Sequence, residues 1–407
     1  MSSGSPKVIT LCVDPPEKHL LRLVSSRSFA SRPIDEPGEG PDIALFPASQ
    51  NLDFIERALA APPGLWRSAR EGRGKVVFDA SGEGKPHTAD RTGRLHQLLH
   101  EVGVPLERAV YVTQDRGYAR DYADHCAGIG LKRTIQVVVY DYWLRRLLGA
   151  FDLTGPEIFE RRREAFTHRR RRRSRRFLSL NYTPRSPRLM FLLSLLHEDL
   201  WDLGHVSFGG FRRKSQGSRK SYKKIRKEFN SLPGFEDKAK ILRPLLPELR
   251  ERQSLLGEFP PTDPYSTALL PHALAEYDDS WFSVATETEM MDRPCRITEK
   301  PLKPLLNFHP LIVFGNPGAL ALIRELGFVT FPELFDESYD EECDPRRRFE
   351  MAFAQVRRLC LMDESGLARA VEALSEKVAF NAEWGLTRLP RIYRDELDEA
   401  LMAALTA

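Results

Sequence analysis

Short runs of apolar and β-branched residues alternate with helical patterns along the first 145 residues. The runs predict strands over Lys7–Val13, Asp42–Phe46, Lys75–Asp79, Arg108–Thr113 and Thr134–Tyr140. Between two of these runs, Leu95, Leu98, Leu99 and Val102 have the spacing of a single helix face. Uninterrupted apolar runs are typical of strands that are buried on both faces of a parallel sheet. The pattern therefore predicts a doubly wound α/β domain over residues 1–149.

A second alternation of the same kind follows an arginine-rich segment. Residues 150–176 contain ten arginines and no strand pattern, which predicts a helical linker. Beyond it, strands are predicted at Phe177–Leu180, His205–Phe208, Trp281–Ala285, Leu311–Phe314 and Phe328–Phe331. A basic and then Pro-rich stretch near residues 211–265 predicts an insertion or a long loop. The expected fold is α/β, with two tandem Rossmann-like domains and an interdomain cleft; the second domain spans residues 177–360, and helices occupy 361–407.

Composition narrows the class of protein. Hydrophobic residues make up 42% of the 407 residues, which is enough for well-packed cores. No apolar run approaches the length of a membrane span, and the first residues lack the pattern of an export signal. The five cysteines are scattered and form no CxxC pair, which argues against a disulfide scaffold and a zinc site. We therefore expect a cytoplasmic protein.

Charge is distributed unevenly along the chain. The formal net charge is only +4, yet residues 161–227 contain 21 Lys and Arg against 4 Asp and Glu. Such a segment indicates an anionic partner, which could be nucleic acid, a glycan or a lipid head group. Aromatic residues are not interleaved with the basic ones, and no helix-turn-helix or RNP pattern occurs. Peripheral contact with an anionic inner membrane and binding of nucleic acid both remain open, as does a simple solvated face.

One candidate anion site lies where the first strand of the second domain ends. Asn181 closes this strand, and Arg185 and Arg188 fall in the first turn of the helix that follows. Free N–H groups at a helix N-terminus attract anions, and an arginine adds a bidentate donor. Ligands of open α/β sheets bind at this edge. An ordinary solvated turn with surface arginines is the alternative.

A second group of charged residues follows the strand at Trp281–Ala285. Glu287 and Glu289 come first, and Glu299 and Lys300 follow at the start of a predicted helix. A lysine in this place can neutralise a phosphate, and a carboxylate can bind sugar or ribose hydroxyls. A solvated ion pair at a helix start is the alternative.

Glycines and acids follow the strand at Leu311–Phe314. Gly315 allows a ligand to approach closely, and Asn316 is expected to cap the next helix. Neither a P-loop nor a GxGxxG pattern is present, so nucleotide triphosphate hydrolysis and NAD chemistry lose support. The later acids of Asp336–Asp340 are compatible with a metal site or with a capped helix start.

Taken in order, these motifs resemble the donor-binding half of GT-B glycosyltransferases, nearest to the α-1,3-fucosyltransferases. They also resemble uncharacterised glycosyltransferase-like proteins of bacteria and phages that share the endings Gly327–Phe331 and Asp336–Asp340. The resemblance covers roughly Arg176–Arg348, under half of the chain. It implies a GT-B transferase that moves a sugar from a nucleotide-sugar donor to a glycan, lipid-linked glycan or protein acceptor.

The resemblance also implies roles for individual residues. Arg185 or Arg188, together with Lys300, would meet the donor diphosphate, and Glu299 would meet the sugar or ribose. Residues 286–289 differ from the family's Phe-Glu-Asn segment, so the sugar and the base stay open. No DxD motif follows a nucleotide-binding strand, so we expect no metal and no cofactor besides the donor substrate. A nucleic-acid-binding or nucleic-acid-modifying protein and a non-catalytic scaffold are the alternatives.

The catalytic base is expected in the N-terminal domain, which would bind the acceptor. The loop after Lys75–Asp79 leaves the carboxyl end of a predicted strand and contains Asp79, Glu83 and His87. Any of the three could take a proton from an acceptor hydroxyl. Glu83 ranks first because its glycine neighbours leave it the most room. Asp79 could instead cap the turn that follows it.

Overall fold

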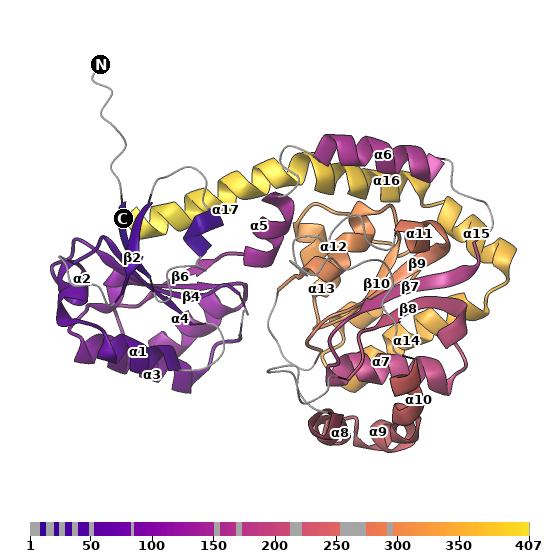
Figure 1. Cartoon of the computed structure of the whole chain (residues 1–407), viewed down its shortest axis with the longest axis horizontal. Helices are drawn as coiled ribbons and strands as arrows, with labels where there is room; N and C mark the ends of the chain where they lie inside the picture. Colours follow the sequence, from indigo (N-terminus) through magenta and orange to yellow (C-terminus); the bar gives the residue numbers. More distant parts are fainter. Residues whose placement is uncertain are drawn as a thin grey trace. The chain divides into compact units, whose positions relative to one another are not determined.

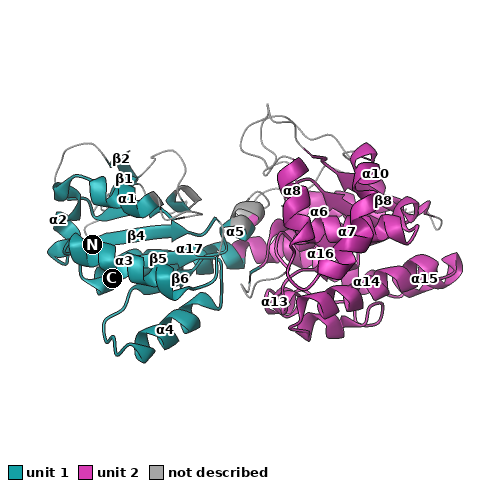
Figure 2. Cartoon of the chain, turned by 90° about the horizontal axis from the view of Figure 1, so that it is seen from below, with its two compact units in different colours: residues 1–146, 294–296, 392–407 teal, residues 147–293, 297–391 magenta. Residues whose placement is uncertain are grey.

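The structure of the chain, a computed structural model, consists of two compact units (Figures 1 and 2). It describes all residues except 1–8, 14–19, 24–28, 35–39, 49–52, 83–84, 150–154, 168–172, 212–221, 253–273, 291–295 and 407. Unit 1 comprises residues 1–146, 294–296 and 392–407, and unit 2 comprises 147–293 and 297–391. The helix within the expected linker, α6 (Gly155–Thr167), belongs to unit 2, where it contacts α16 (Ser375–Glu383).

Unit 1 contains a parallel sheet with the strand order β2-β1-β3-β4-β5-β6. The strands are β1 (Ile9–Val13), β2 (Phe29–Pro33), β3 (Ile43–Pro47), β4 (Lys75–Ala80), β5 (Ala109–Thr113) and β6 (Gln136–Val139). Five of them coincide with predicted strands. β2 was not predicted, because its sequence Phe-Ala-Ser-Arg-Pro has no apolar run; it lies at the sheet edge and pairs with β1 alone. The side chains of β2 are half-buried or exposed, so this strand has no need of an apolar run.

Alternate residues of these strands face two different cores. Ala44, Phe46 and Phe78 pack on one face, against α1 (Asp53–Ala60), α3 (Ala89–Glu101) and α4 (Tyr118–Gly128). Ile43, Leu45 and Val77 pack on the other face, where the end of the C-terminal helix covers them. Because strand side chains alternate between faces, a sheet buried on both sides needs apolar residues at consecutive positions. This is the physical origin of the runs seen in the sequence.

Unit 2 contains a second parallel sheet with the order β10-β9-β7-β8. The strands β7 (Arg175–Asn181), β8 (Gly204–Phe208), β9 (Ser280–Thr286) and β10 (Leu311–Phe314) all overlap predicted strands. The principal helices around the sheet are α7 (Ser186–His197), α12 (Glu299–Leu306), α13 (Ala319–Glu325), α14 (Pro345–Leu361), α15 (Glu364–Glu372) and α16. Both units are therefore Rossmann-like α/β structures, as the alternation predicted.

The strand predicted at Phe328–Phe331 is wrong. Phe328 and Phe331 are buried as the apolar pattern requires, but the segment joins no sheet. Its backbone is paired by side chains instead. The amide of Asn381 accepts from Val329 N and donates to Val329 O, both at 2.9 Å, and Glu337 Oε1 accepts from Phe331 N at 2.7 Å. Side-chain partners thus satisfy the groups that a neighbouring strand would otherwise pair.

The stretch near 211–265 is partly helical rather than a long loop. Its described portion contains α8 (Tyr222–Asn230), α9 (Glu236–Leu242) and α10 (Leu246–Glu251), all of which contact α7. Ile225 and Phe229 form the buried side of α8. The basic residues of α8 therefore lie on an amphipathic helix whose buried side packs on unit 2.

The last helix does not stay with the helices before it. α14, α15 and α16 lie in unit 2, whereas α17 (Leu389–Thr406) continues into unit 1 from Ile392 onward. Asp398 anchors it there, because its carboxylate accepts from Arg145 at 2.8 Å and from Tyr140 Oη at 2.9 Å. A charged pair this deeply buried is stable only when its partners satisfy each other.

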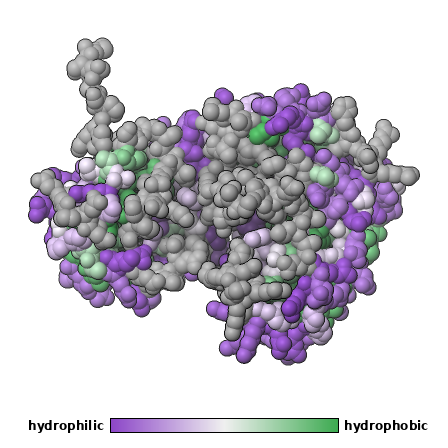
Figure 3. Space-filling model, viewed as in Figure 1, coloured by the Kyte–Doolittle hydropathy of each residue, from purple (hydrophilic) through white to green (hydrophobic). Residues whose placement is uncertain are grey.

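The described surface in the view of Figure 3 is mostly hydrophilic, with separate hydrophobic spots. Within the described ranges, no helix is both long and apolar enough to cross a membrane.

Candidate functional site

Charged and polar side chains gather at the carboxyl edge of the unit 2 sheet. β7, β9 and β10 end beside one another, since β9 pairs with both of its neighbours in parallel. Asn181, the last residue of β7, is buried and fully engaged. Its Oδ1 accepts from Thr286 Oγ1 at 2.5 Å, its Nδ2 donates to Ser179 Oγ at 3.0 Å, and its N–H donates to Ser207 Oγ at 2.9 Å. Asn181 therefore ties neighbouring strands together at this edge.

The two arginines that follow β7 have different surroundings. Arg188 is buried, and its Nη1 donates to Thr183 O at 3.1 Å, its Nη2 to Thr288 Oγ1 at 3.1 Å and its Nε to Thr286 O at 3.3 Å. Burial lowers the pKa of Arg188, and the charges of nearby Glu287 and Glu299 oppose that shift. Arg185 is exposed at the N-terminal boundary of α7. Arg188 thus positions the edge, while Arg185 is accessible to a ligand.

Lys300 is held between two carboxylates at the start of α12. Its Nζ lies 3.2 Å from Glu299 Oε1 and 3.6 Å from Glu287 Oε2. Thr298 caps α12 by accepting from Lys300 N, and its hydroxyl donates to Glu287 at 2.7 Å. A Ser or Thr before Glu-Lys is a common start of a helix, which explains this local arrangement. The sequence-predicted residues Glu287, Glu299 and Lys300 are therefore brought together.

Lys303 belongs to the same cluster, although the sequence analysis missed it. Burial lowers the pKa of Lys303 to about 8. The charge of Glu299 opposes this shift, and the charges of Lys300 and Arg188 add to it. Burial alone would raise the pKa of Glu299, but the ammonium groups of Lys300 and Lys303 lower it to about 2. The signal that could have found Lys303 is its spacing of four residues from Glu299, which is one helical turn.

The cluster carries more positive than negative charge. Its cations are Arg185, Arg188, Lys300 and Lys303, and its carboxylates are Glu287 and Glu299. With two carboxylates for four cations, the formal excess is two positive charges at the edge where α/β sheets bind ligands. Such an excess in a half-buried place favours an anion.

The loop after β10 adjoins this cluster. The N-terminus of α13, the helix that follows this loop, is already occupied by a side chain of the chain itself. A Cβ on Gly315 would lie 3.3 Å from Glu287 Cγ, so the glycine permits this close approach. Asn316 was expected to cap α13; the cap is instead Gly318, at φ +81°. Asp340 Oδ1 accepts from Leu320 N at 2.9 Å, which places an internal anion at the helix start. The positive end of α13 is thereby neutralised.

The other acids of the Asp336–Asp340 segment also have structural partners. Asp336 Oδ1 accepts from Ser338 N at 3.0 Å, and Glu337 Oε2 accepts from Thr330 Oγ1 at 2.9 Å. These contacts correspond to the capping alternative. Among the residues that the structure describes, no three His, Cys, Asp or Glu side chains converge as metal ligands would. Glu289, also predicted at the donor site, is half-buried just after Thr288.

The predicted bases of unit 1 have separate surroundings. Asp79 is the penultimate residue of β4, and its Oδ1 accepts from Ser81 N at 3.0 Å and Ser81 Oγ at 2.5 Å, which is the turn-capping contact. Burial raises the pKa of Asp79, and the Ser81 hydrogen bonds oppose that shift. Glu83 lies outside the described residues.

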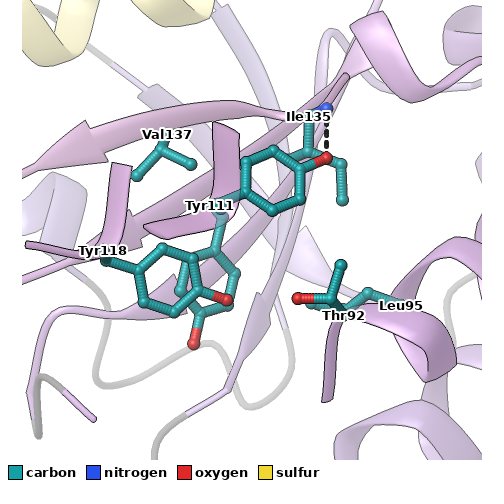
Figure 4. A pocket seen from close by; sticks show the side chains of 7 residues that line it. Thr92, Leu95, Tyr111, Tyr118, Ile135 and Val137 are labelled. Atoms are coloured by element: carbon teal, nitrogen blue, oxygen red, sulfur yellow. Dashed lines mark hydrogen bonds between the residues drawn. The ribbon is translucent and has the colours of Figure 1, made fainter. Parts of the chain in front are cut away.

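His87 contacts Tyr118, which is one of the residues that line a small aromatic pocket; Figure 4 shows these lining residues. The His87 ring meets Tyr118 edge-on at 5.5 Å and lies 5.2 Å from the ring of His125. The pocket is lined mainly by aromatic and aliphatic side chains, including Tyr111 and Tyr118, and Tyr122 Oη accepts from Ile135 N at 2.9 Å. Burial lowers the pKa of His87, and the proximity of His125 lowers it further. His87 is therefore neutral at pH 7.

Part of the basic segment serves the interior of unit 2. Arg162 is buried and pairs with Asp278 at 3.3 Å. The Arg173 guanidinium stacks 4.2 Å above the ring of Trp281 and donates to Ser280 O at 2.5 Å. By contrast, Lys223, Arg226 and their basic neighbours on α8 are exposed.

Comparisons with known proteins leave the family open. No family model matches the chain, and no curated protein matches it. Among solved structures, the UDP-forming α,α-trehalose-phosphate synthase of Burkholderia vietnamiensis aligns with a TM-score of 0.44 and 14% identity, over 89% of this chain and 74% of that one. The enzyme of the same description from Burkholderia xenovorans has the same TM-score and identity, with 90% and 75% coverage. The N-terminal domain of a Candida albicans trehalose-6-phosphate phosphatase scores 0.41 at 12% identity, with 90% and 71% coverage. Similarity at this level does not establish an activity.

Proposed function

We propose that the chain is a glycosyltransferase that binds a nucleotide-sugar donor at the carboxyl edge of the unit 2 sheet. The observation that carries the proposal is the excess of cations over carboxylates among Arg185, Arg188, Lys300, Lys303 and their two glutamates. The ordered resemblance of residues 176–348 to the donor half of GT-B enzymes supports it. The diphosphate of a nucleotide sugar is the anion that both observations favour.

In this proposal the cationic side chains differ in role. Arg185 is exposed and Lys300 is half-buried, so both can contact the diphosphate. Arg188 makes its hydrogen bonds to backbone carbonyls and Thr288, and acts by fixing the turn from which Arg185 projects. Positive charge placed at the diphosphate stabilises the negative charge that develops as the sugar bond breaks. The transfer is proposed to use these cations in place of a metal.

The two glutamates and Thr298 hold the ammonium group of Lys300 in one place. Without them, a lysine side chain would sample many rotamers, and ordering it on binding would cost conformational entropy. Glu287 is itself fixed by Thr298, so the ammonium has a defined position before the ligand arrives. Glu299 is also proposed to accept from a sugar or ribose hydroxyl, because its low pKa keeps it a carboxylate at neutral pH.

A panel of nucleoside diphosphates tests the proposal directly. The full chain is melted with and without ADP, CDP, GDP, UDP and TDP. A ligand at 100 times its Kd stabilises the folded chain by about 2.7 kcal/mol, which a thermal-shift assay resolves. Lys300→Met should abolish the shift, and Lys238→Met is the matched control, since Lys238 is a half-buried lysine that pairs with Glu350 on other helices. If no diphosphate shifts the melting temperature, the proposal is wrong.

The exposed cations of α8 favour nucleic acid binding as the second candidate. Lys223, Lys224, Arg226 and Lys227 are exposed on this helix, whose buried side packs on the domain. Duplex DNA bound by such a face should lose affinity steeply with salt, with a log–log slope set by the number of phosphates contacted. Steep salt-dependent DNA binding in a chain that no nucleoside diphosphate stabilises would favour this function instead. Anionic vesicles in a parallel binding assay test the proposed membrane contact.

A further inference from the structure

Helix α12 presents three charged residues toward the cation cluster. Glu299, Lys300 and Lys303 lie within its first five residues, and Leu302, Leu305 and Leu306 form its buried side. Since positions four apart share a helix face, Lys303 stands one turn beyond Glu299. The charges of Glu299, Lys300 and Arg188 all act on its ammonium group, which places Lys303 at the cluster.

The ammonium of Lys303 shares the negative charge of Glu299 with Lys300. Lys300 has two carboxylate neighbours, but Lys303 Nζ has no hydrogen bond or ion pair within the described part of the chain. On the packed helix α16, Lys377 pairs with Glu333 and Glu383 pairs with Arg388, and Glu376 is exposed. Because Lys300 and Lys303 both act on the single carboxylate of Glu299, a ligand anion would offset the positive charge that remains.

We propose that Lys303 is a ligand-binding residue of this site, whose ammonium group pairs with a phosphate of the nucleotide bound by Arg185 and Lys300. The inference rests on the proposed function and adds a residue that no motif identified. It also assigns a pH dependence to donor binding, because a phosphate that pairs with Lys303 stabilises its protonated form.

The sign of that dependence follows from the titration of Lys303. Its pKa of about 8 in the free protein means that the ammonium is mostly charged at pH 7 and mostly neutral at pH 9. If a bound phosphate raises this pKa by one unit, the affinity falls about fivefold between pH 7 and pH 9. Glu299 does not contribute, since its pKa of about 2 keeps it ionised throughout. Affinity should therefore be highest below pH 8 and decrease above it.

The experiment measures Kd by calorimetry at pH 7, 8 and 9 for UDP, GDP and inorganic pyrophosphate, with wild type, Lys303→Arg and Lys303→Met. Arginine stays charged across this range, so Lys303→Arg should bind with little pH dependence. Lys303→Met should bind about tenfold more weakly than wild type at pH 7, with no further loss at pH 9. Titration of the ligand's own phosphates affects all three proteins equally and cancels in the comparison.

Two controls separate the possible failures. Circular dichroism establishes that each variant is folded, and Lys238→Met should leave every Kd unchanged. If UDP or GDP binds, but Lys303→Met binds as tightly as wild type or Lys303→Arg keeps the wild-type pH slope, the inference is wrong and the proposed function stands. If none of the three ligands binds wild type at any pH, both are overturned.

Discussion

Replacing Arg188 by methionine tests whether this arginine positions the site rather than binding the ligand. Methionine has a similar length but no donors, so the carbonyls of Thr183 and Thr286 would lose the hydrogen bonds that the guanidinium now makes. Each buried acceptor left without a partner costs about 1–3 kcal/mol. Removing a buried charge returns part of that cost, because its desolvation penalty disappears. We expect a net destabilisation of about 2–4 kcal/mol.

The exposed neighbour provides the control for this prediction. Arg185→Met should change the free energy of unfolding by less than about 0.5 kcal/mol, as is usual for exposed positions. Arg185→Met should nevertheless weaken nucleoside diphosphate binding. The stability of Arg188→Lys should lie between those of the wild type and Arg188→Met, because the single ammonium nitrogen of lysine cannot reach all three acceptors that the guanidinium nitrogens now contact.

Thermal melts followed by circular dichroism measure the difference. For domains of this size, each kcal/mol lowers Tm by about 2–4 °C, so Arg188→Met and Arg185→Met are readily distinguished. An Arg188→Met variant that melts with the wild type would refute the reasoning. So would an Arg185→Met variant that is destabilised as strongly.

Three further predictions concern other parts of the chain. Asn381→Ala should lower the free energy of unfolding by about 2–4 kcal/mol in a urea titration, because it leaves both backbone groups of Val329 without their partners. A decrease as small as that of an alanine substitution at an exposed position would contradict this prediction. Burial and the charge of His125 lower the pKa of His87 in the folded chain. The contribution of His87 to the free energy of unfolding should therefore be complete above about pH 6.5 and decrease as the pH falls below it. His87→Asn should flatten the dependence of stability on pH between about pH 5 and 7. Glu83→Gln should abolish sugar transfer and preserve nucleotide binding if Glu83 is the base, and an unchanged transfer rate would eliminate Glu83.

Local pattern was sufficient for most of the fold. β4, β5 and β10 each contain a run of apolar residues, and such runs can be recognised without knowing their neighbours. The alternation of these runs with helical spacing then predicted two parallel-sheet units. Where the backbone partner lay far away in sequence, the same reasoning was wrong. Phe328–Phe331 has the pattern of a buried strand, but Asn381 and Glu337 pair its backbone from distant positions.

The candidate site shows the same division between local and distant causes. The sequence by itself determined that Arg185 and Arg188 follow a strand, that Thr298 starts a helix before Glu-Lys, and that the middle of the chain is basic. Tertiary structure decided which arginine is buried against Thr286, and it added Lys303 to the cluster. Burial and electrostatic neighbours depend on segments about one hundred residues apart, whereas helix starts and apolar runs depend on adjacent residues.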